Sequence, residues 1–326
     1  MYRLWNFLSI CCLVASLCLF IDISDRLLHG EPDIFGSIIL IIQTSITPFI
    51  IGGFLTRSGK NSLNEYLKKI GFPVYFRQKG KLSIAASFLF ILIFFYMIMP
   101  IIGNAYHGFG KISAGYETLT NREIIEPHKA LKNYKRAIKY SPDNRTFRYS
   151  LAAFYERLND LELAKKEYKL LAGVGHLQSA INLSRLYLSE GKIENASRIL
   201  SKALHEKEFQ DFYKKNQINE ISTDTNYDLQ VNLGWTRLLQ KNYKTAYEYL
   251  DEAITIDTYL APAHCLLAIT KEDTGNYKDS LVEWEKCLAL AGRNNRQWEW
   301  TVNMRQWYDM AQQRVDPDDI PPQEPK

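Results

Sequence analysis

The sequence predicts an all-α protein, with a three-helix transmembrane anchor at its amino-terminal end followed by a solenoid of about five helix pairs and a capping helix. Two observations lead to this fold class. Residues 4–21, 34–55 and 82–102 are apolar and contain no Asp, Glu, Lys, Arg or His. In the second half of the chain, large and small residues recur with a period of 34 positions, which is the pattern of stacked helical repeats.

The three apolar stretches are 18, 22 and 21 residues long, and about 20 apolar residues are enough for a helix to cross a bilayer. We therefore assign residues 1–102 to a transmembrane anchor. Two alternatives stay open, because the first stretch could be a cleaved signal peptide and the others could be buried helices of a soluble core. We expect the polar residues within Gln43–Pro48 to form hydrogen bonds between helices, the alternative being a ligand or permeation path.

Charge predicts the orientation of these spans. The loop 57–81 carries seven Lys and Arg residues against one acidic residue, whereas the segment 22–33 carries four acidic residues against Arg26. Basic loops stay in the cytoplasm, so loop 57–81 is predicted to be cytoplasmic and the third span delivers the rest of the chain to the outer side. In a bacterium the protein would be a multi-pass protein of the cytoplasmic (inner) membrane with a periplasmic C-terminal domain.

The same basic loop is a candidate contact with the lipid bilayer. Leu63, Leu67 and Ile70 share one helical face beside basic residues, which is typical of a short amphipathic helix on an anionic surface. The alternative is that these charges only set the topology. The candidate membrane-surface residues are Lys60, Lys68, Lys69, Arg77, Lys79 and Lys81.

The repeat is clearest in residues 232–294. Leu233, Gly234 and Ala246 are followed 34 positions later by Leu267, Ala268 and Ser280. Ala164 and Ala196 occupy the position of Ala246 in earlier copies. This pattern closely resembles the tetratricopeptide repeat family, whose unit is a pair of antiparallel helices. We place the solenoid at 103–315, with units at 111–144, 145–176, 177–210, 227–260 and 261–294 and an insertion at 205–226.

The end of the chain is predicted to close the solenoid. Trp300, Met304, Trp307 and Ala311 share one helical face, so residues 296–314 are expected to form a capping helix, with exposed docking tryptophans as the alternative. The tail 316–326 is rich in proline and acidic residues and is expected to be disordered.

Composition and motifs argue against an enzyme or a metal site. The six histidines are scattered, and no metal, nucleotide or hydrolase motif occurs, so we expect no catalytic residue, metal, cofactor or small-molecule substrate. Residues 103–326 hold 31 basic and 31 acidic residues, which argues against a nucleic-acid partner. The family resemblance places Cys265 and Cys287 on different faces, so we expect Cys287 to be a packing residue, with a disulfide as the alternative.

The resemblance implies the function. In this family the first helix of each unit lines a concave groove that receives a peptide or helix of a partner protein. By position, the groove residues would be Tyr149, Arg157, Ile181, Arg185, Leu188, Val231, Trp235, Leu238 and Ile269. The alternative is that packing between repeats, or the 205–226 insertion, buries them. We expect a membrane-anchored scaffold or adaptor, the alternative being an accessory subunit of an envelope biogenesis or export machine whose spans pair with a membrane enzyme.

Overall fold

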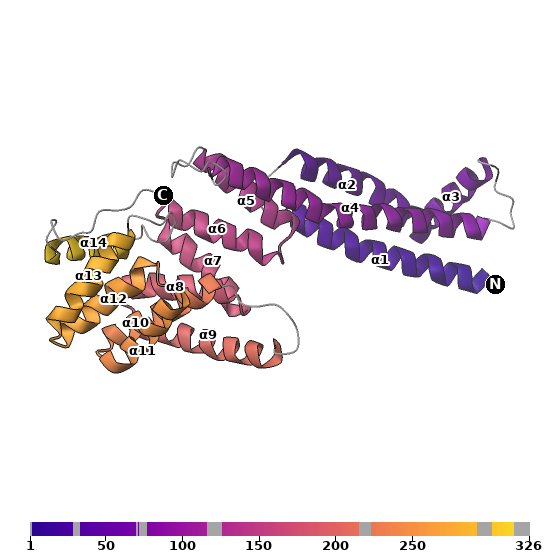
Figure 1. The fold of residues 1–326 in the computed structure, drawn as a ribbon. Coiled ribbons are helices and arrows are strands. Elements are labelled where there is room, and N and C mark those ends of the chain that lie inside the picture. The colour runs from indigo at the N-terminus through magenta and orange to yellow at the C-terminus, as the bar shows by residue number, and fades with distance from the viewer. Residues whose placement is uncertain are drawn as a thin grey trace. The chain divides into compact units, whose positions relative to one another are not determined.

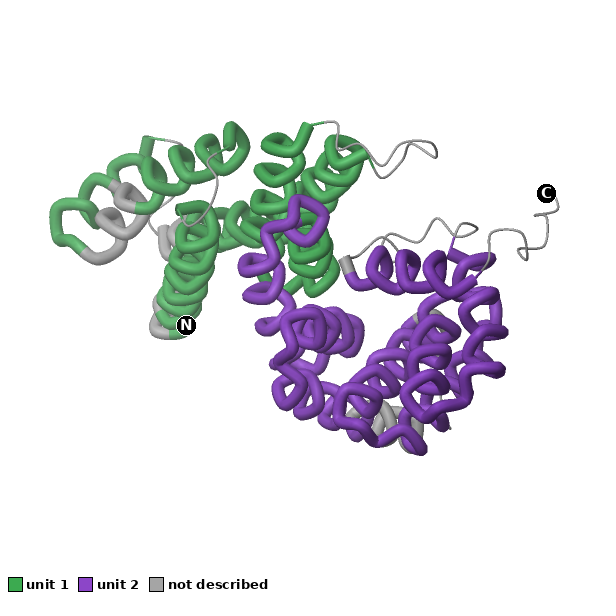
Figure 2. Tube along the Cα trace, turned by 90° about the vertical axis from the view of Figure 1, so that its left-hand side faces the viewer, with its two compact units in different colours: residues 1–154 green, residues 155–326 purple. Residues whose placement is uncertain are grey.

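The computed structural model describes residues 2–28, 33–69, 71, 77–115, 126–214, 223–291 and 302–315, and every regular element in these ranges is an α-helix (Figure 1). The chain divides into two compact units, residues 1–154 and 155–326 (Figure 2), and each is described by itself. The predicted tail 316–326 lies outside the described residues, as do 116–125, 215–222 and 292–301.

The first unit contains the predicted anchor. Its helices are α1 (Tyr2–Leu28), α2 (Ile34–Leu55), α3 (Arg57–Lys69) and α4 (Arg77–Ser113). Helices α1 and α4 pack along their length, with Ile23, Leu92 and Met99 fully buried. Side chains such as Phe7 and Phe90 point outward and are 63% and 71% exposed. Helices α1 and α4 thus have one packed face and one exposed apolar face.

Two described segments are long and apolar enough to cross a membrane, Phe7–Leu28 and Leu82–Ser113. In α2, the apolar segment Ile34–Thr47 is shorter than a span, and the side chains of residues 48–55 lie outside the description. Gln43 and Thr47 of α2 are buried, and their side-chain polar atoms have no hydrogen-bond partner within the described residues.

Helix α4 does not end with its apolar stretch but continues to Ser113 and packs against α5 (Pro127–Tyr140). The two helices approach closely because α4 has a glycine at the contact. A Cβ atom on Gly110 would lie 2.8 Å from the ring of Tyr134, which is shorter than carbon atoms tolerate. The last three turns of α4 therefore pair with α5 as the first helix of a helix pair.

A buried ion pair joins the start of α2 to the end of α5. The Asp33 carboxylate accepts a hydrogen bond from the backbone N–H of Gly36 at 2.8 Å, as a helix N-cap does. Lys139 Nζ donates a hydrogen bond to Asp33 Oδ2 at 3.0 Å, and the Tyr140 hydroxyl donates one to Asp33 Oδ1 at 2.6 Å. Burial disfavours the charged carboxylate, but these hydrogen bonds outweigh it and hold the pKa of Asp33 below its ordinary value.

The second unit contains the clearest repeats. Its helices are α7 (Leu161–Gly173), α8 (Leu177–Ser189), α9 (Ile193–Lys214), α10 (Thr223–Leu239), α11 (Tyr243–Ile256), α12 (Ala261–Asp273), α13 (Tyr277–Ala291) and α14 (Val302–Arg314). They follow α6 (Arg145–Arg157), which crosses the boundary between the units. Helices α8 and α9, α10 and α11, and α12 and α13 pack as consecutive pairs.

Small residues lie where paired helices meet. Ala164, Ala196 and Ala246 have no exposed surface, and Ser280 is 4% exposed. The turns between helices use left-handed backbone, with φ of 57° at Lys241 and 80° at Gly275. This conformation ends one helix and reverses the chain within a few residues, which sets the short spacing of each pair.

The last pair is linked by a disulfide between Cys265 of α12 and Cys287 of α13. Our expectation that Cys287 only packs, on a face remote from Cys265, is wrong. The Cα atoms of the two cysteines are 4.9 Å apart, within the range that a disulfide requires. Both positions face the contact between the two helices, where Ala268 and other small residues allow this approach.

Buried charges also hold this pair together. Glu283 of α13 lies 2.7 Å from His264 Nδ1 and 3.2 Å from Lys271 Nζ, both on α12. Burial opposes ionisation of Glu283, but the hydrogen bond with His264 and the charge of Lys271 outweigh it and lower its pKa to about 2. The carboxylate therefore stays charged down to strongly acidic pH.

We predict that Gly234→Ala destabilises the protein although alanine favours helices. A Cβ at this position would lie 2.6 Å from Leu250 Cγ, and overpacking costs about 1–3 kcal/mol, which outweighs a helix-propensity gain of about 1 kcal/mol. Thermal unfolding of the purified chain measures the change. Gly173→Ala is the matched control, because its Cβ would meet no atom within 4 Å. A midpoint raised equally by both substitutions would contradict the close contact.

Candidate partner-binding surface

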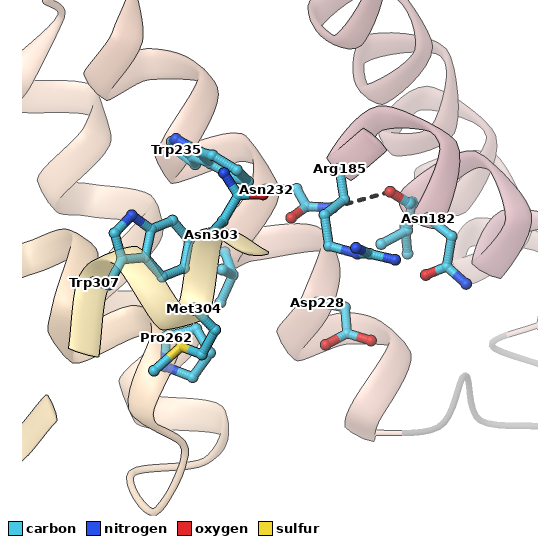
Figure 3. Close-up of a pocket in the computed structure, with 11 residues that line it drawn as sticks. Asn182, Arg185, Asp228, Asn232, Trp235, Pro262, Asn303, Met304 and Trp307 are labelled. Atoms are coloured by element: carbon cyan, nitrogen blue, oxygen red, sulfur yellow. Dashed lines mark hydrogen bonds between the residues drawn. The ribbon is translucent and has the colours of Figure 1, made fainter. Parts of the chain in front are cut away.

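Helices α8, α10, α12 and α14 surround a small pocket in the second unit (Figure 3). Its volume is about 30 Å³, which holds about two water molecules. The pocket is lined by Ile181, Asn182 and Arg185 of α8, by Asp228, Val231, Asn232 and Trp235 of α10, by Pro262 of α12, and by Asn303, Met304 and Trp307 of α14.

The apolar part of this surface is covered by the chain's own helix α14. The ring of Trp307 meets that of Trp235 edge to face, with centroids 4.9 Å apart. Trp235 is 6% exposed and Met304 is 3% exposed. Figure 3 shows Met304 and Trp307 on α14 beside the aromatic side of the pocket. The surface thus accepts a helix that presents a methionine and a tryptophan.

The other end of the pocket is polar. Arg185 forms an ion pair with Glu156 at the end of α6. Asn232 donates a hydrogen bond to the backbone carbonyl of Ile181 at 3.0 Å, so α10 is fixed against α8. Asp228 accepts one from Gln178 at 3.2 Å. Charged and amide groups of both α8 and α10 are therefore held in place beside the apolar end.

Helix α14 is held in place by contacts at its C-terminal end as well as by the packing of Trp307. Arg314 Nε donates to both carboxylate oxygens of Glu272 at 2.9 and 2.8 Å, and its guanidinium lies 5.3 Å from the centre of the Trp284 ring. Ala311 is fully buried. The predicted capping helix is thus present at Val302–Arg314, while residues 296–301, and with them Trp300, lie outside the described residues.

The predicted groove residues divide into two groups. Ile181, Arg185, Val231 and Trp235 all line the pocket. The others lie away from it. Leu188 and Leu238 are buried in the core, Ile269 packs against that core, and Tyr149 and Arg157 are half-buried at two positions of α6.

Four polar residues of the pocket, Asn182, Asp228, Asn232 and Asn303, were not predicted from the sequence. The sequence could have indicated two of them, because Asp228 and Asn232 are four positions apart and lie on the same helical face as the predicted groove residue Val231. The insertion of Trp307 and Met304 had no such signal. The apolar face of α14 by itself predicts only that it is covered, and no local pattern indicates which helix covers it.

The candidate membrane-surface residues lie on two helices. Lys60, Lys68 and Lys69 are on α3, where Lys68 and Lys69 close its last turn. Arg77, Lys79 and Lys81 lie in the first turns of α4, and their side chains are outside the description. Within the described residues, no group of three His, Cys, Asp or Glu side chains could hold a metal ion.

Comparison with known proteins places a repeat on this surface. The sequence model of the family described as "Tetratricopeptide repeat" matches residues 227–259, which contain α10 from Tyr227 and all of α11. The BBSome complex member BBS4 of Bos taurus is 24% identical over 192 residues. The aligned region spans 51% of this chain and 37% of that protein.

Two solved structures are similar to the chain at low sequence identity. MamA from Desulfovibrio magneticus RS-1 is 12% identical with a TM-score of 0.43, over 60% of this chain and 97% of that one. TTC0263, a tetratricopeptide protein of Thermus thermophilus, is 18% identical with a TM-score of 0.43, over 64% of this chain and 98% of that one.

We predict that Trp235→Ala and Trp307→Ala each lower the free energy of unfolding by about 3–5 kcal/mol, since both rings are buried. The double variant should lose less than the sum, with a coupling of about 0.5–1.5 kcal/mol from the edge-to-face contact. Unfolding followed by circular dichroism measures this. Tyr259→Ala is the control, because that ring is 69% exposed. Additive losses would show that α14 does not contact α10.

Proposed function

Because the chain belongs to the tetratricopeptide-repeat family, we propose that it is a membrane-anchored, non-catalytic scaffold that holds a partner protein at the outer face of the cytoplasmic membrane. Tetratricopeptide repeats mediate protein–protein interactions, and the surfaces that solenoids use are formed by the concave side of their stacked repeats. The observation that carries the proposal is the pocket between α8 and α10, which already accommodates the aromatic side chain of a helix.

The exposed apolar surface of the first unit supports membrane anchoring. In each of the apolar segments of α1 and α4, only 22% of the most apolar 18-residue stretch is buried, whereas the core helix of a soluble protein is mostly buried. Large apolar side chains, among them Ile10, Ile38 and Phe94, are about half exposed. Contiguous surface of this kind is unfavourable in water and is typical of a membrane or protein contact. We therefore assign α1, α2 and α4 to the bilayer.

Three observations support a solenoid outside the cytoplasm. The basic residues lie on α3 and at the start of α4, and basic loops remain inside. Asp33 contacts α5 through Lys139, so the acidic segment and the first helix pair lie at the same end of the anchor. The Cys265–Cys287 disulfide is of a kind that persists in oxidising compartments such as the periplasm.

The partner segment would bind along the polar end of the pocket, next to α14. Arg185 and Asp228 offer charges of both signs there, and Asn182 adds an amide. Such groups, fixed in place by their neighbours, pair with the backbone and polar side chains of an extended or helical segment.

We predict that a topology reporter fused after Lys326 is active only outside the cytoplasm, and one inserted at Gly59 only inside. Thiol alkylation of the denatured, unreduced protein should modify three cysteines, namely Cys11, Cys12 and Cys18. Reduction before alkylation should make two more cysteines, Cys265 and Cys287, reactive. The opposite reporter pattern, or five reactive thiols without reductant, would place the solenoid in the cytoplasm.

The binding role is tested with a photocrosslinking amino acid placed at Asn182, which lines the pocket. Irradiation of intact cells should yield discrete adducts with a partner protein. The control places the same residue at Glu252, which is exposed on α11 and outside the pocket. Adducts of equal size and yield at both positions would show that the concave surface is not a specific binding site.

A further inference from the structure

A second and much larger cavity lies between α7, α8 and α9. Its volume is about 380 Å³, within the range of pockets that bind small molecules, about 300–1,000 Å³. Leu177, Ala180 and Leu183 of α8 and Ile199 and Ala203 of α9 supply its apolar walls. The cavity is open to solvent, because its lining residues Lys169, Arg198 and Lys202 are exposed.

The charged residues around this cavity all have the same sign. Lys169 of α7 and Arg198 and Lys202 of α9 line it, and no acidic residue among the described residues does so. None of the three forms an ion pair with another described residue. Arg198 and Lys202 are four positions apart on one helix, and like charges at this spacing destabilise a helix. An anion between them would remove this repulsion.

Two basic residues near the cavity, unlike the three that line it, form ion pairs within the chain. Lys165, also on α7, is paired with Glu162 and Glu190, and Lys192 is paired with Glu190 at 2.7 Å. Lys165 and Lys192 are thus paired within the chain, whereas the three basic residues that line the cavity have no acidic partner among the described residues. This difference points to a negatively charged ligand from outside the chain.

Two exposed apolar residues directly follow cavity-lining residues in the sequence. Leu170 on α7 and Val174, which directly follows that helix, are 52% and 55% exposed, and they adjoin Lys169 and Gly173, which line the opening. Apolar walls with a basic rim match a molecule that has an acidic head and an apolar tail. Neither inorganic phosphate nor a neutral hydrocarbon would satisfy both parts of the cavity.

We propose that this cavity binds a single anionic amphiphile, with a carboxylate or phosphate head on Lys169, Arg198 and Lys202 and an acyl chain against Leu177, Ala180 and Leu183. A fatty acid and an acidic phospholipid share this chemistry. The site is separate from the pocket beside α14, so the inference does not depend on the proposed scaffold role. It departs from the expectation, drawn from the sequence, that the protein has no small-molecule ligand.

The test uses the full chain in nanodiscs of neutral phosphatidylcholine and a photoactivatable fatty acid that carries a diazirine on its chain. After irradiation, mass spectrometry should locate adducts on peptides from residues 169–203. The double substitution Arg198→Glu and Lys202→Glu should reduce their yield about tenfold or more, since it replaces charge-assisted contacts by repulsion. Ala172→Leu, which narrows the cavity from α7, should reduce it with the charges intact.

The matched control is Lys166→Glu with Lys278→Glu, which changes the net charge equally at exposed positions that do not line the cavity. Its adduct yield should equal that of the natural protein. Competition by unlabelled dodecanoate or by dodecyl phosphate, which have the same chain, should lower the yield, and the more effective competitor shows whether a carboxylate or a phosphate head is preferred. Adducts confined to residues 1–113, an unchanged yield in the Arg198 and Lys202 variant, or displacement by inorganic phosphate alone would each overturn the proposal.

Discussion

The structure depends on the close approach of two helices at a small residue. Gly234 against Leu250 and Gly110 against Tyr134 are the sharpest cases, since one added carbon at either glycine would lie within 2.8 Å of its neighbour. The buried alanines Ala164, Ala196 and Ala246 allow a similar close approach at other helix contacts. Each approach brings two helices near enough for their large side chains to interdigitate, and dispersion and apolar burial then stabilise the pair. Because each pair presents its remaining apolar face to the next, stability spreads along the solenoid.

The first helix pair differs from the others because it shares helix α4 with the apolar helices of the first unit. Helix α4 begins with an apolar stretch and ends as the partner of α5, and the Asp33–Lys139 ion pair connects the start of α2 to the end of α5. Removing one member of such a buried pair costs about 3–5 kcal/mol, because the other charge is left without a partner. The first pair is therefore attached to the apolar helices α2 and α4 at more than one point of the chain.

Two surfaces of the second unit have different chemistry. The pocket beside α14 is small, and its aromatic side is already covered by Trp307. The cavity between α7 and α9 is large, open and basic. A protein segment suits the first, because backbone and side-chain polar groups meet the amides and charges there. A small acidic ligand suits the second. The two surfaces share α8, so the packing of that helix links them.

The sequence by itself determined the helical class, the small residues at the helix contacts and the positions where the clearest helix pairs begin. Local periodicity carries this information, since a residue's place in a repeat depends on its near neighbours. Only the tertiary structure decided which segments distant along the chain touch. From the sequence, Asp33 is one of four acidic residues in a loop, Cys287 is expected to pack with a disulfide as the alternative, and Trp235 is either a groove residue or a buried one. Each is defined by a partner on another helix, Lys139, the other cysteine or Trp307, and contacts across such distances leave no periodic trace in the sequence.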